Sequence, residues 1–402
     1  MAKRALALIN KSKNMMLASL QSNIVFLHRS IRNFVKKILV LCPYPENCAP
    51  SQRLKYEQYF DSFRQAGYQV KTSSFVNKRF WKIIYKHGLW LSKACFTFTG
   101  YVKRIYDLFR IRRFDVVYIH LWVTPLGLPV FEWLVRLLAR SVIYDIDDMI
   151  FLGHSSNANR LLQGLKGRKK IIFLMKSSDS VITSTPALET FARNHNKNVT
   201  DIPATLNTCG FDAKTEYSIQ GSVVLGYSGS HSTSKYLHSI EPAFEKLLQI
   251  KTFEFVVFVV GDSRFRFSNP DIPVEAKDWT LADEHADLMR MDIGLYPLTD
   301  EPWVYGKRGG KALLYMGAGL PVIATAIGTN FDTFQDGENG FLVGVTDMED
   351  WVSKIVMLAH DENLRRKTGV AAREALEKNF SVEANKDKYL KVIASITKRK
   401  DR

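Results

Sequence analysis

Short apolar runs alternate with longer stretches of helical periodicity along this chain from residue 37 onward. In the first half, these runs have the length and apolar content of strands that are buried on both faces of a parallel sheet. The predicted strands are residues 37–42, 68–75, 115–121, 142–147, 180–184 and 199–202. A helix is predicted from Ser51 to about residue 65, because Ser51 can cap it and Gly67 can end it.

The same alternation restarts after a polar stretch at residues 211–221. Further strands are predicted at residues 223–227, 253–260, 274–279, 292–298 and 321–326. Helices are predicted at residues 234–249, 281–291, 310–317 and 348–359, and helices within residues 362–398 complete the pattern.

Strands that alternate with helices predict an α/β protein whose parallel sheets carry helices on both faces. We therefore predict two Rossmann-like, doubly wound domains that face each other across a cleft. The predicted divisions are a basic N-terminal extension at residues 1–36, a first domain at 37–215, a second domain at 220–378, and a helix at 379–402 that packs back toward the first domain. Ligands of such sheets bind beyond the carboxyl ends of the strands, so residues directly after strands are the best site candidates.

The composition is that of a globular protein, with 46% hydrophobic and 24% charged residues in a chain of 402. The four cysteines form no Cys-x-x-Cys pair and no Cys/His cluster, which favours a reducing compartment and predicts no metal site. No uninterrupted apolar segment reaches the roughly 18 residues that a membrane-spanning helix needs. The first 36 residues lack an evident cleavage site, so we interpret them as an extension and expect a cytoplasmic protein.

Positive charge is concentrated in two parts of the chain, whose formal net charge is +16. Eight Lys/Arg residues precede the first acidic residue, Glu46, and residues 78–113 contain ten Lys/Arg and the single acid Asp107. Aromatic residues are interleaved with the charges of residues 78–113, which suits the surface of an anionic bilayer. The alternative interpretation is a solvated basic face with core aromatics. No nucleic-acid-binding motif accompanies the charge, so no nucleic-acid partner is expected.

The turn after the predicted strand 223–227 is a first candidate phosphate site. Gly229, Ser230 and His231 lie between that strand and a helix. The free N–H groups and the dipole of a helix N-terminus attract anions, and glycine allows a ligand to approach the backbone closely. Many strand-to-helix turns use glycine and serine for packing alone, so this signal is weak by itself.

A second candidate is the turn at residues 306–311 (GKRGGK), just before an apolar helix. Lys307 and Lys311 are four residues apart, so a helical turn would place them on one side. Two ammonium groups there could neutralise a diphosphate leaving group. The alternative is a solvated basic turn.

Ionisable residues also follow the strands of the first half. His120 ends an apolar strand and would lie at the cleft, either as a functional group or as a histidine that only lines the core. Asp145, Asp147 and Asp148 follow the next strand and could bind a metal, act as a base, hold sugar hydroxyls or simply cap a helix. Arg53, at the start of the first helix, could reach a phosphate across the cleft or remain solvated.

Several motifs together resemble family 4 glycosyltransferases. Residues 317–324 (GAGLPVIA) resemble the family signature AxGxPVVA, and residues 328–342 resemble its GGxxE…DGxNGxL continuation with matching spacing. Residues 43–57 are similar to a bacterial, surface-polysaccharide branch of the family. The resemblance extends over about residues 37–395 and implies the GT-B fold of two Rossmann-like domains.

This resemblance implies a function as well. The second domain would bind a nucleotide diphosphate sugar, UDP- or GDP-linked, and the first would hold a saccharide or lipid-linked acceptor. Hexosyl transfer would retain the anomeric configuration and need no catalytic metal and no cofactor. His120 matches a histidine near the transferred sugar, Gly229, Ser230 and Lys307 match the diphosphate-binding loops, and Asp332 stands where the family has a glutamate.

The sequence departs from the family at two positions. Family members often have two glutamates eight positions apart that contact the sugar and the ribose, and here Gly306 and Leu314 occupy them. A branch with GKxGxK before YMxAG lacks the pair too, so we favour substitution over lost activity. The substitutes would be Lys307, Lys311, Asp300 or Glu301, and Asp147, Asp148, Asp300 and Glu301 are the candidate sugar or acceptor contacts.

Three alternatives to a transferase remain open from the sequence. A nucleotide-sugar epimerase would use the same fold without an acceptor, which leaves the basic aromatic helices unexplained. A nucleotide-sugar-binding protein without transferase activity would account for the missing glutamates. A membrane or nucleic-acid adaptor would use only the basic surface. We favour the transferase over these three alternatives. We expect it to bind peripherally to the cytoplasmic face of the membrane through residues 78–113.

Overall fold

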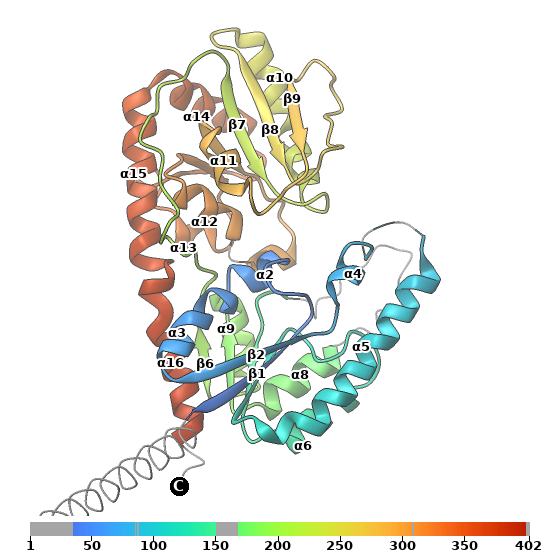
Figure 1. The fold of residues 1–402 in the computed structure, drawn as a ribbon. Helices are drawn as coiled ribbons and strands as arrows, with labels where there is room; N and C mark the ends of the chain where they lie inside the picture. Colours follow the sequence, from blue (N-terminus) through green and yellow to red (C-terminus); the bar gives the residue numbers. More distant parts are fainter. Residues whose placement is uncertain (1–34, 85, 87, 150–167, 308, 399–402) are drawn as a thin grey trace, which may run out of the picture.

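Two parallel six-stranded sheets form the framework of the computed structural model, which describes residues 35–84, 86, 88–149, 168–307 and 309–398 (Figure 1). The first sheet has the order β2-β1-β3-β4-β5-β6 and the second has the order β12-β11-β10-β7-β8-β9. The strands of the first sheet are β1 (Lys36–Cys42), β2 (Tyr68–Ser74), β3 (Val116–His120), β4 (Val142–Asp145), β5 (Ser180–Thr183) and β6 (Val199–Asp201). Those of the second are β7 (Val223–Ser228), β8 (Phe255–Val260), β9 (Val274–Lys277), β10 (Ile293–Tyr296), β11 (Val322–Thr325) and β12 (Phe341–Val343).

Helices surround both sheets. Those of the first half are α2 (Pro50–Arg53), α3 (Phe60–Gln65), α4 (Lys78–Trp81), α5 (Trp90–Arg110), α6 (Val130–Leu138), α8 (Arg168–Ser177) and α9 (Pro186–Arg193). Those of the second half are α10 (Glu241–Ile250), α11 (Glu284–Met289), α12 (Gly310–Gly317), α13 (Asn330–Thr333), α14 (Met348–His360), α15 (Glu362–Asn379) and α16 (Val382–Lys398). The 3₁₀ helices among the described residues are η1 (Tyr56–Tyr59), η2 (Ile111–Arg113), η5 (Ser234–Ile240) and η6 (Pro302–Gly306).

Both faces of each sheet are buried, which explains why the strands are continuous apolar runs. Along β1, Ile38 and Val40 belong to one core cluster, whereas Leu39 and Leu41 belong to another on the opposite face. The second domain has the same arrangement, with separate clusters on the two sides of its sheet. The GT-B architecture expected from the sequence is therefore present: two Rossmann-like domains with helices packed around parallel sheets.

The last two helices connect the domains, as Figure 1 shows for the red helices α15 and α16. On α15, Arg373 donates a 2.7 Å hydrogen bond to the carbonyl of Phe211 between the sheets. On α16, Tyr389 lies against Tyr59, with ring centroids 4.4 Å apart, and Ile393 joins the core under the first sheet. Helix α16 thus packs against the first domain.

The predicted helix 51–65 is wrong as one continuous element. The structure divides it into α2, η1 and α3, and Ala49, not Ser51, stands at the N-cap of α2. The break falls at Lys55, whose φ of −122° and ψ of −117° are not helical. This backbone turn allows the Lys55 side chain to enter the core, where it donates to the carbonyls of Thr183 and Ile202 at 3.0 Å each.

No helix in the described part of the chain is long and apolar enough to cross a bilayer. Among the described residues, no group of three or more His, Cys, Asp or Glu side chains is arranged to hold a metal ion.

Candidate functional site

The turns after β7 and β8 pack so closely that glycine is required between them. A Cβ atom on Gly229 would lie 2.7 Å from Cε and 2.8 Å from Nζ of Lys311. Gly261, after β8, has φ +109°, and a Cβ there would lie 2.5 Å from the Gly229 carbonyl oxygen. The first candidate phosphate turn is therefore in direct contact with the lysine of the second. Ser230 and His231 are exposed in the same turn.

Lys311 lies in the first turn of α12 and points toward the turn after β7. Its Nζ donates a 2.6 Å hydrogen bond to the hydroxyl of Tyr227 and lies 4.5 Å from the centroid of that ring. Burial of the ammonium group, reinforced by the nearby charge of Lys307, lowers the pKa of Lys311 to about 7. A cation held at such a cost gains most when an anion binds beside it.

Lys307 reaches from the second domain toward the first. Its Nζ lies 4.6 Å from the ring centroid of Trp303 and 3.7 Å from Oδ2 of Asp148. The charge of Lys307 is close enough to act on Lys311. Lys311 in turn contacts the Gly229 turn at the carboxyl end of the second sheet.

His120 is fully buried at the end of β3 and lies between two carboxylates. Its Nδ1 is 3.7 Å from Oδ2 of Asp145, and its Nε2 is 3.8 Å from Oδ1 of Asp147. Neither ring nitrogen has a hydrogen-bond partner within the described ranges. The Tyr56 ring packs against the imidazole with centroids 5.0 Å apart. The histidine is thus held by packing, with a carboxylate near each ring nitrogen.

Asp145 is the fixed member of this group. It is fully buried, pairs with Lys55 Nζ at 3.0 Å, and accepts a short hydrogen bond from the Tyr118 hydroxyl. Burial alone would raise the pKa of Asp145, but Lys55, His120 and Tyr118 outweigh it and hold that pKa below its usual value. Asp145 is therefore ionised at neutral pH. Sequence reasoning missed Lys55, because a lysine within a helical pattern is normally solvent-exposed.

The pKa of Asp147 is shifted upward, in contrast to that of Asp145. Burial, with smaller contributions from neighbouring charges, raises the pKa of Asp147 to about 6. A carboxyl group whose pKa is higher in the folded than in the unfolded protein destabilises the fold at any pH above its folded-state pKa. At a pH below its unfolded-state pKa, the group is protonated in both states and has no such effect. We expect Asp147→Asn to raise the unfolding free energy by roughly 2 kcal/mol at pH 8 and by little at pH 4. Urea unfolding at both pH values measures this difference.

The exposed Asp61, which pairs only with Arg64 at the surface, offers the matched control. Asp61→Asn is expected to change stability little at either pH. An Asp147→Asn variant whose stability follows that of wild type at every pH would contradict the raised pKa.

Arg53 has a different partner from the phosphate that the sequence suggested. Its guanidinium forms a bidentate pair with Glu284 of the second domain, at 2.6 and 2.7 Å. It also lies 5.4 Å from the Trp279 ring centroid, and the indole N–H of Trp279 donates to Glu284 at 2.9 Å. Arg53 therefore holds the two domains together beside β9 in this structure.

Asp300 and Glu301 shape η6 from within the second domain. The Tyr305 hydroxyl donates to Asp300 at 3.3 Å, and Glu301 accepts from the Thr299 hydroxyl at 2.9 Å and from the indole N–H of Trp303. These contacts fix the segment that carries Lys307.

The two positions where the family often has glutamates are structurally closed to them. A Cβ on Gly306 would lie 2.4 Å from Cγ of Met149 in the other domain. Leu314 is buried in the core of the second domain. The interdomain contact thus leaves no room for a side chain at position 306, and Leu314 is part of the core.

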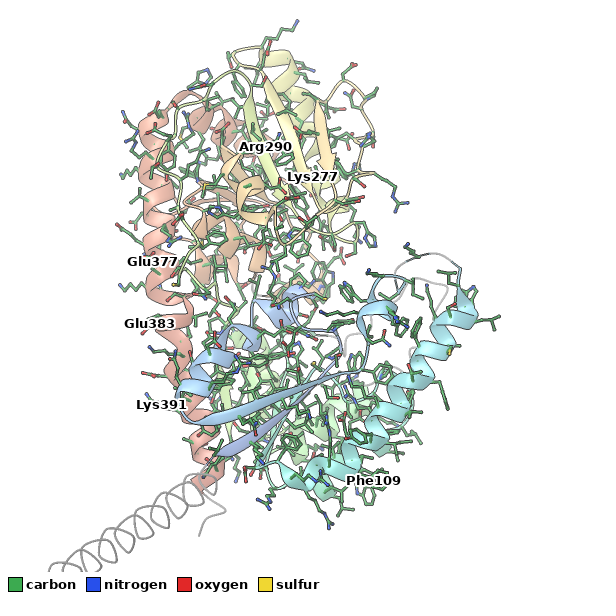
Figure 2. The ribbon with its side chains drawn as sticks, in the orientation of Figure 1. Phe109, Lys277, Arg290, Glu377, Glu383 and Lys391 are labelled. Atoms are coloured by element: carbon green, nitrogen blue, oxygen red, sulfur yellow. The ribbon has the colours of Figure 1, made fainter. Side chains whose placement is uncertain are left out.

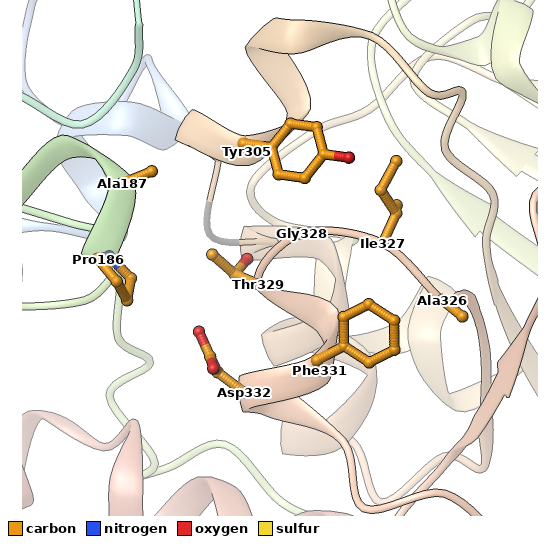
Figure 3. Close-up of a pocket in the computed structure, with 9 residues that line it drawn as sticks. All are labelled: Pro186, Ala187, Tyr305, Ala326, Ile327, Gly328, Thr329, Phe331 and Asp332. Atoms are coloured by element: carbon orange, nitrogen blue, oxygen red, sulfur yellow. The ribbon is translucent and has the colours of Figure 1, made fainter. Parts of the chain in front are cut away.

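A pocket of about 280 Å³ lies between the domains beside this site (Figure 3). The first domain contributes Pro186 and Ala187 from the start of α9. The second domain contributes Tyr305 and the segment after β11, which includes Thr329, Phe331 and Asp332. Asp332 is thus placed in this pocket. Sequence reasoning did not find the pocket, because its walls come from segments far apart in the chain.

Comparisons with known proteins agree with this architecture. Residues 222–361 match the family model described as glycosyl transferases group 1. The capsular polysaccharide biosynthesis glycosyltransferase CapM of Staphylococcus aureus is 23% identical over 256 residues, which are 61% of this chain and 60% of CapM. The lipopolysaccharide core biosynthesis glycosyltransferase LpsE of Rhizobium meliloti is 30% identical over 113 residues, 28% of this chain and 32% of LpsE. The matched regions therefore cover less than two thirds of either relative.

Solved structures share the fold over nearly the whole chain. Sucrose-phosphate synthase from Thermosynechococcus elongatus superposes with a TM-score of 0.66 at 17% identity, covering 90% of this chain and 99% of that one. HepE of Anabaena in complex with UDP-glucose gives a TM-score of 0.64 at 14% identity, covering 89% and 99%. At these identities the likeness shows the fold, and the matched family model supports the glycosyltransferase resemblance of the second domain.

Proposed function

We propose that this chain is a glycosyltransferase that moves a hexose from a UDP- or GDP-linked donor to a saccharide or lipid-linked acceptor, with retention of configuration. The observation that carries the proposal is the convergence of Lys307, Lys311 and the Gly229 turn at the carboxyl end of the second sheet. Glycosyltransferase relatives, and a structural neighbour that holds UDP-glucose, support the choice of donor.

Transfer requires that a diphosphate leave while positive charge develops at the anomeric carbon. Two ammonium groups and backbone N–H groups at a helix start stabilise the departing charge without reorganisation. Lys311 regains its full charge as the diphosphate binds beside it, so it neutralises the leaving group. Because these groups supply positive charge, we propose that turnover persists in the presence of a metal chelator.

On the first domain, the Asp147 side chain is 15% exposed, and the buried His120 lies 3.8 Å from it. Asp148 lies 3.7 Å from Lys307, so the first-domain acids adjoin the diphosphate position. We assign His120 and Asp147 to orienting the transferred sugar or the acceptor hydroxyl.

A thermal-shift screen with UDP- and GDP-linked sugars tests the donor proposal. A bound donor at a hundred times its dissociation constant stabilises the fold by about 2.7 kcal/mol, which gives a readily measured shift. Product analysis with donor alone then separates transfer from epimerisation. If no nucleotide or nucleotide sugar shifts the unfolding temperature, the proposal is wrong.

We also propose peripheral attachment to an anionic membrane, through a surface that we call the α5–α6 face. Helix α5 exposes Trp90, Leu91, Phe98 and Phe109, with exposed fractions of 81%, 88%, 68% and 83%. Helix α6 packs beside it, with the rings of Tyr101 and Phe131 5.6 Å apart, and adds exposed Trp133 and Leu137. Leu128, just before α6, is exposed as well. Arg112 and Arg113 follow α5 and are exposed. Phe109, labelled in Figure 2, lies on this face.

The double variant Trp90→Ser/Phe109→Ser is expected to bind anionic vesicles at least about tenfold more weakly, because two large apolar side chains no longer enter the interface. Co-sedimentation with phosphatidylglycerol vesicles across a salt series measures this. Ile250→Ser/Val370→Ser removes exposed apolar residues elsewhere and should bind like wild type. Equal vesicle binding by both double variants would contradict the assignment of the α5–α6 face.

A further inference from the structure

Tyr227 connects the two candidate phosphate turns through a single hydroxyl group. It is the last residue but one of β7, it is fully buried, and its ring packs in the same core cluster as Leu237 of η5. The hydroxyl donates a 2.6 Å hydrogen bond to the carbonyl of Thr233, at the end of the turn that begins with Gly229. The same oxygen accepts a 2.6 Å hydrogen bond from Lys311 Nζ.

These two hydrogen bonds have a fixed direction, because a carbonyl oxygen can only accept. The hydroxyl proton of Tyr227 is therefore used by Thr233, and a lone pair of the hydroxyl oxygen faces the Lys311 ammonium. Burial raises the pKa of Tyr227 well above its usual value, so the hydroxyl keeps its proton at neutral and moderately basic pH. Lys311 thus has a neutral acceptor of one orientation, beside an aromatic ring whose centroid is 4.5 Å away.

The contact with Tyr227 holds Lys311 against the backbone of the Gly229 turn. A Cβ atom on Gly229 would lie 2.8 Å from Lys311 Nζ and 2.8 Å from Oγ1 of Thr233. One helical turn further along α12, the Tyr315 hydroxyl accepts a 2.7 Å hydrogen bond from the backbone N–H of Ser228. Helix α12 is therefore fixed to the end of β7 by two side chains that are four residues apart.

The other neighbours of Lys311 do not favour its charged form. Among the described charged groups, Lys307 is the one whose field acts on Lys311, and two like charges repel. Tyr296 and Tyr315 lie next to the same turns and remain neutral, because burial raises the pKa of each. Within the described residues, the Tyr227 hydroxyl is therefore the acceptor that stabilises the Lys311 ammonium before an anion binds.

We propose that Tyr227 is a positioning residue, which holds the Lys311 ammonium over the Gly229 turn so that it meets the diphosphate there. This role rests on the proposed function, because it requires that the turn bind a nucleotide diphosphate. Tyr227 acts through Lys311, since its ring lies in the core and its hydroxyl is engaged by Thr233 and Lys311. An ammonium has three donors, so Lys311 keeps two for phosphate oxygens while it remains bonded to Tyr227.

Tyr227→Phe keeps the ring and removes the acceptor, so it separates positioning from packing. Without the hydroxyl the charged form of Lys311 is less favoured, and the pKa of Lys311 should fall. Calorimetric titration with UDP and GDP should show an affinity about tenfold below wild type at pH 8.5, but within about threefold of wild type at pH 5.5. The nucleotide's own phosphate titrates equally for both proteins, so the ratio of the two affinities reports the protein.

Tyr217→Phe is the matched control. Tyr217 is buried in the same domain, and its hydroxyl donates a 2.8 Å hydrogen bond to the carbonyl of Gly319, beyond the end of α12 opposite to Lys311. This variant loses a comparable hydrogen bond and should bind nucleotide like wild type at both pH values. The double variant Tyr227→Phe/Lys311→Met should bind like Lys311→Met alone, because the effect of Tyr227 passes through the lysine.

Three results would overturn the positioning role: wild-type affinity of Tyr227→Phe at both pH values, an equal loss at both, or a further loss in the Lys311→Met background. Tyr227→Phe removes one oxygen atom and should fold, which thermal unfolding without nucleotide verifies. If wild type binds neither UDP nor GDP, the proposed donor is wrong. NMR titration of the Lys311 side chain, assigned by its absence from Lys311→Met, then tests the contact alone, and an equal pKa of Lys311 in wild type and Tyr227→Phe would refute it.

Discussion

Lys311→Met is expected to reduce transfer from the nucleotide sugar by about 10²–10³-fold, the usual cost of removing one preorganised group that stabilises a developing negative charge. Lys311 contacts the Gly229 turn, donates to Tyr227 and lies within the field of Lys307. Methionine preserves most of the side-chain volume, so the loss reports charge and not packing. Steady-state rates with the donor identified by thermal shift measure the effect.

The same variant should change the pH dependence of nucleotide binding. The pKa of Lys311 is lowered to about 7 in the free protein, chiefly by burial, so the ammonium form is complete only below pH 7. Diphosphate binding favours the charged form, so above pH 7 affinity for UDP or GDP should fall by up to about tenfold per pH unit. Below pH 7 Lys311 is mostly charged, so its titration should cause little further change in the affinity for UDP or GDP.

Calorimetric titrations of wild type, Lys311→Met and Lys391→Ala between pH 6 and 9 check this. Lys391 is exposed on α16, as Figure 2 shows, and its variant should keep the wild-type pH profile. The Lys311→Met profile should lose the decline above pH 7. Wild-type affinity that does not change from pH 6 to 9, or an unchanged decline in Lys311→Met, would refute the role of Lys311.

Lys55→Met should lower the unfolding free energy by about 3–5 kcal/mol, the typical cost of removing one partner from a buried ion pair. The Lys55 ammonium is buried at the carboxyl ends of the strands of the first sheet, where it pairs with Asp145 and donates to two carbonyls. Without it, a fully buried carboxylate loses its main counter-charge, and two carbonyls lose a donor. Urea unfolding at pH 7 measures the loss.

The pH dependence identifies the cause. In wild type, the pKa of Asp145 is held low, so its stabilising contribution is present above its ordinary unfolded pKa and is lost as pH falls through the folded pKa. Lys55→Met should raise the pKa of Asp145, and the double variant Lys55→Met/Asp145→Asn should recover part of the loss at pH 7. Lys82→Met removes an exposed lysine of the same domain and should cost little. A Lys55→Met protein as stable as Lys82→Met would show that the buried pair contributes nothing.

The sequence predicted most of the fold because strands buried on both faces are apolar runs, which are visible without any partner. β1, β3, β7 and β8 were located in this way to within a few residues. β12 was missed because it has only three residues, Phe341–Val343, after a polar turn. The break at Lys55 was missed because the carbonyls that attract the lysine come from β5 and the segment after β6, more than a hundred residues away.

The candidate site divides in the same way. The sequence located the Gly229 turn and Lys311 after strands of the same sheet. Their proximity arises because these strands, β7 and β10, are neighbours, an order that the sequence did not predict. Contacts between the domains could not be predicted, because they depend on how the two domains pack. These unpredicted interdomain features are the Arg53–Glu284 pair, the contact of Gly306 with Met149, and the pocket beside Asp332.

Hydrogen–deuterium exchange of the wild-type protein, with and without saturating UDP or GDP, tests the central claim most directly. If lysine charges and backbone N–H groups at the end of the second sheet hold a diphosphate, the nucleotide should slow exchange in peptides containing residues 228–234 and 309–313. Uridine and guanosine, which lack the diphosphate, should not produce this protection. Protection by neither nucleotide, or protection confined to other segments, would contradict the account.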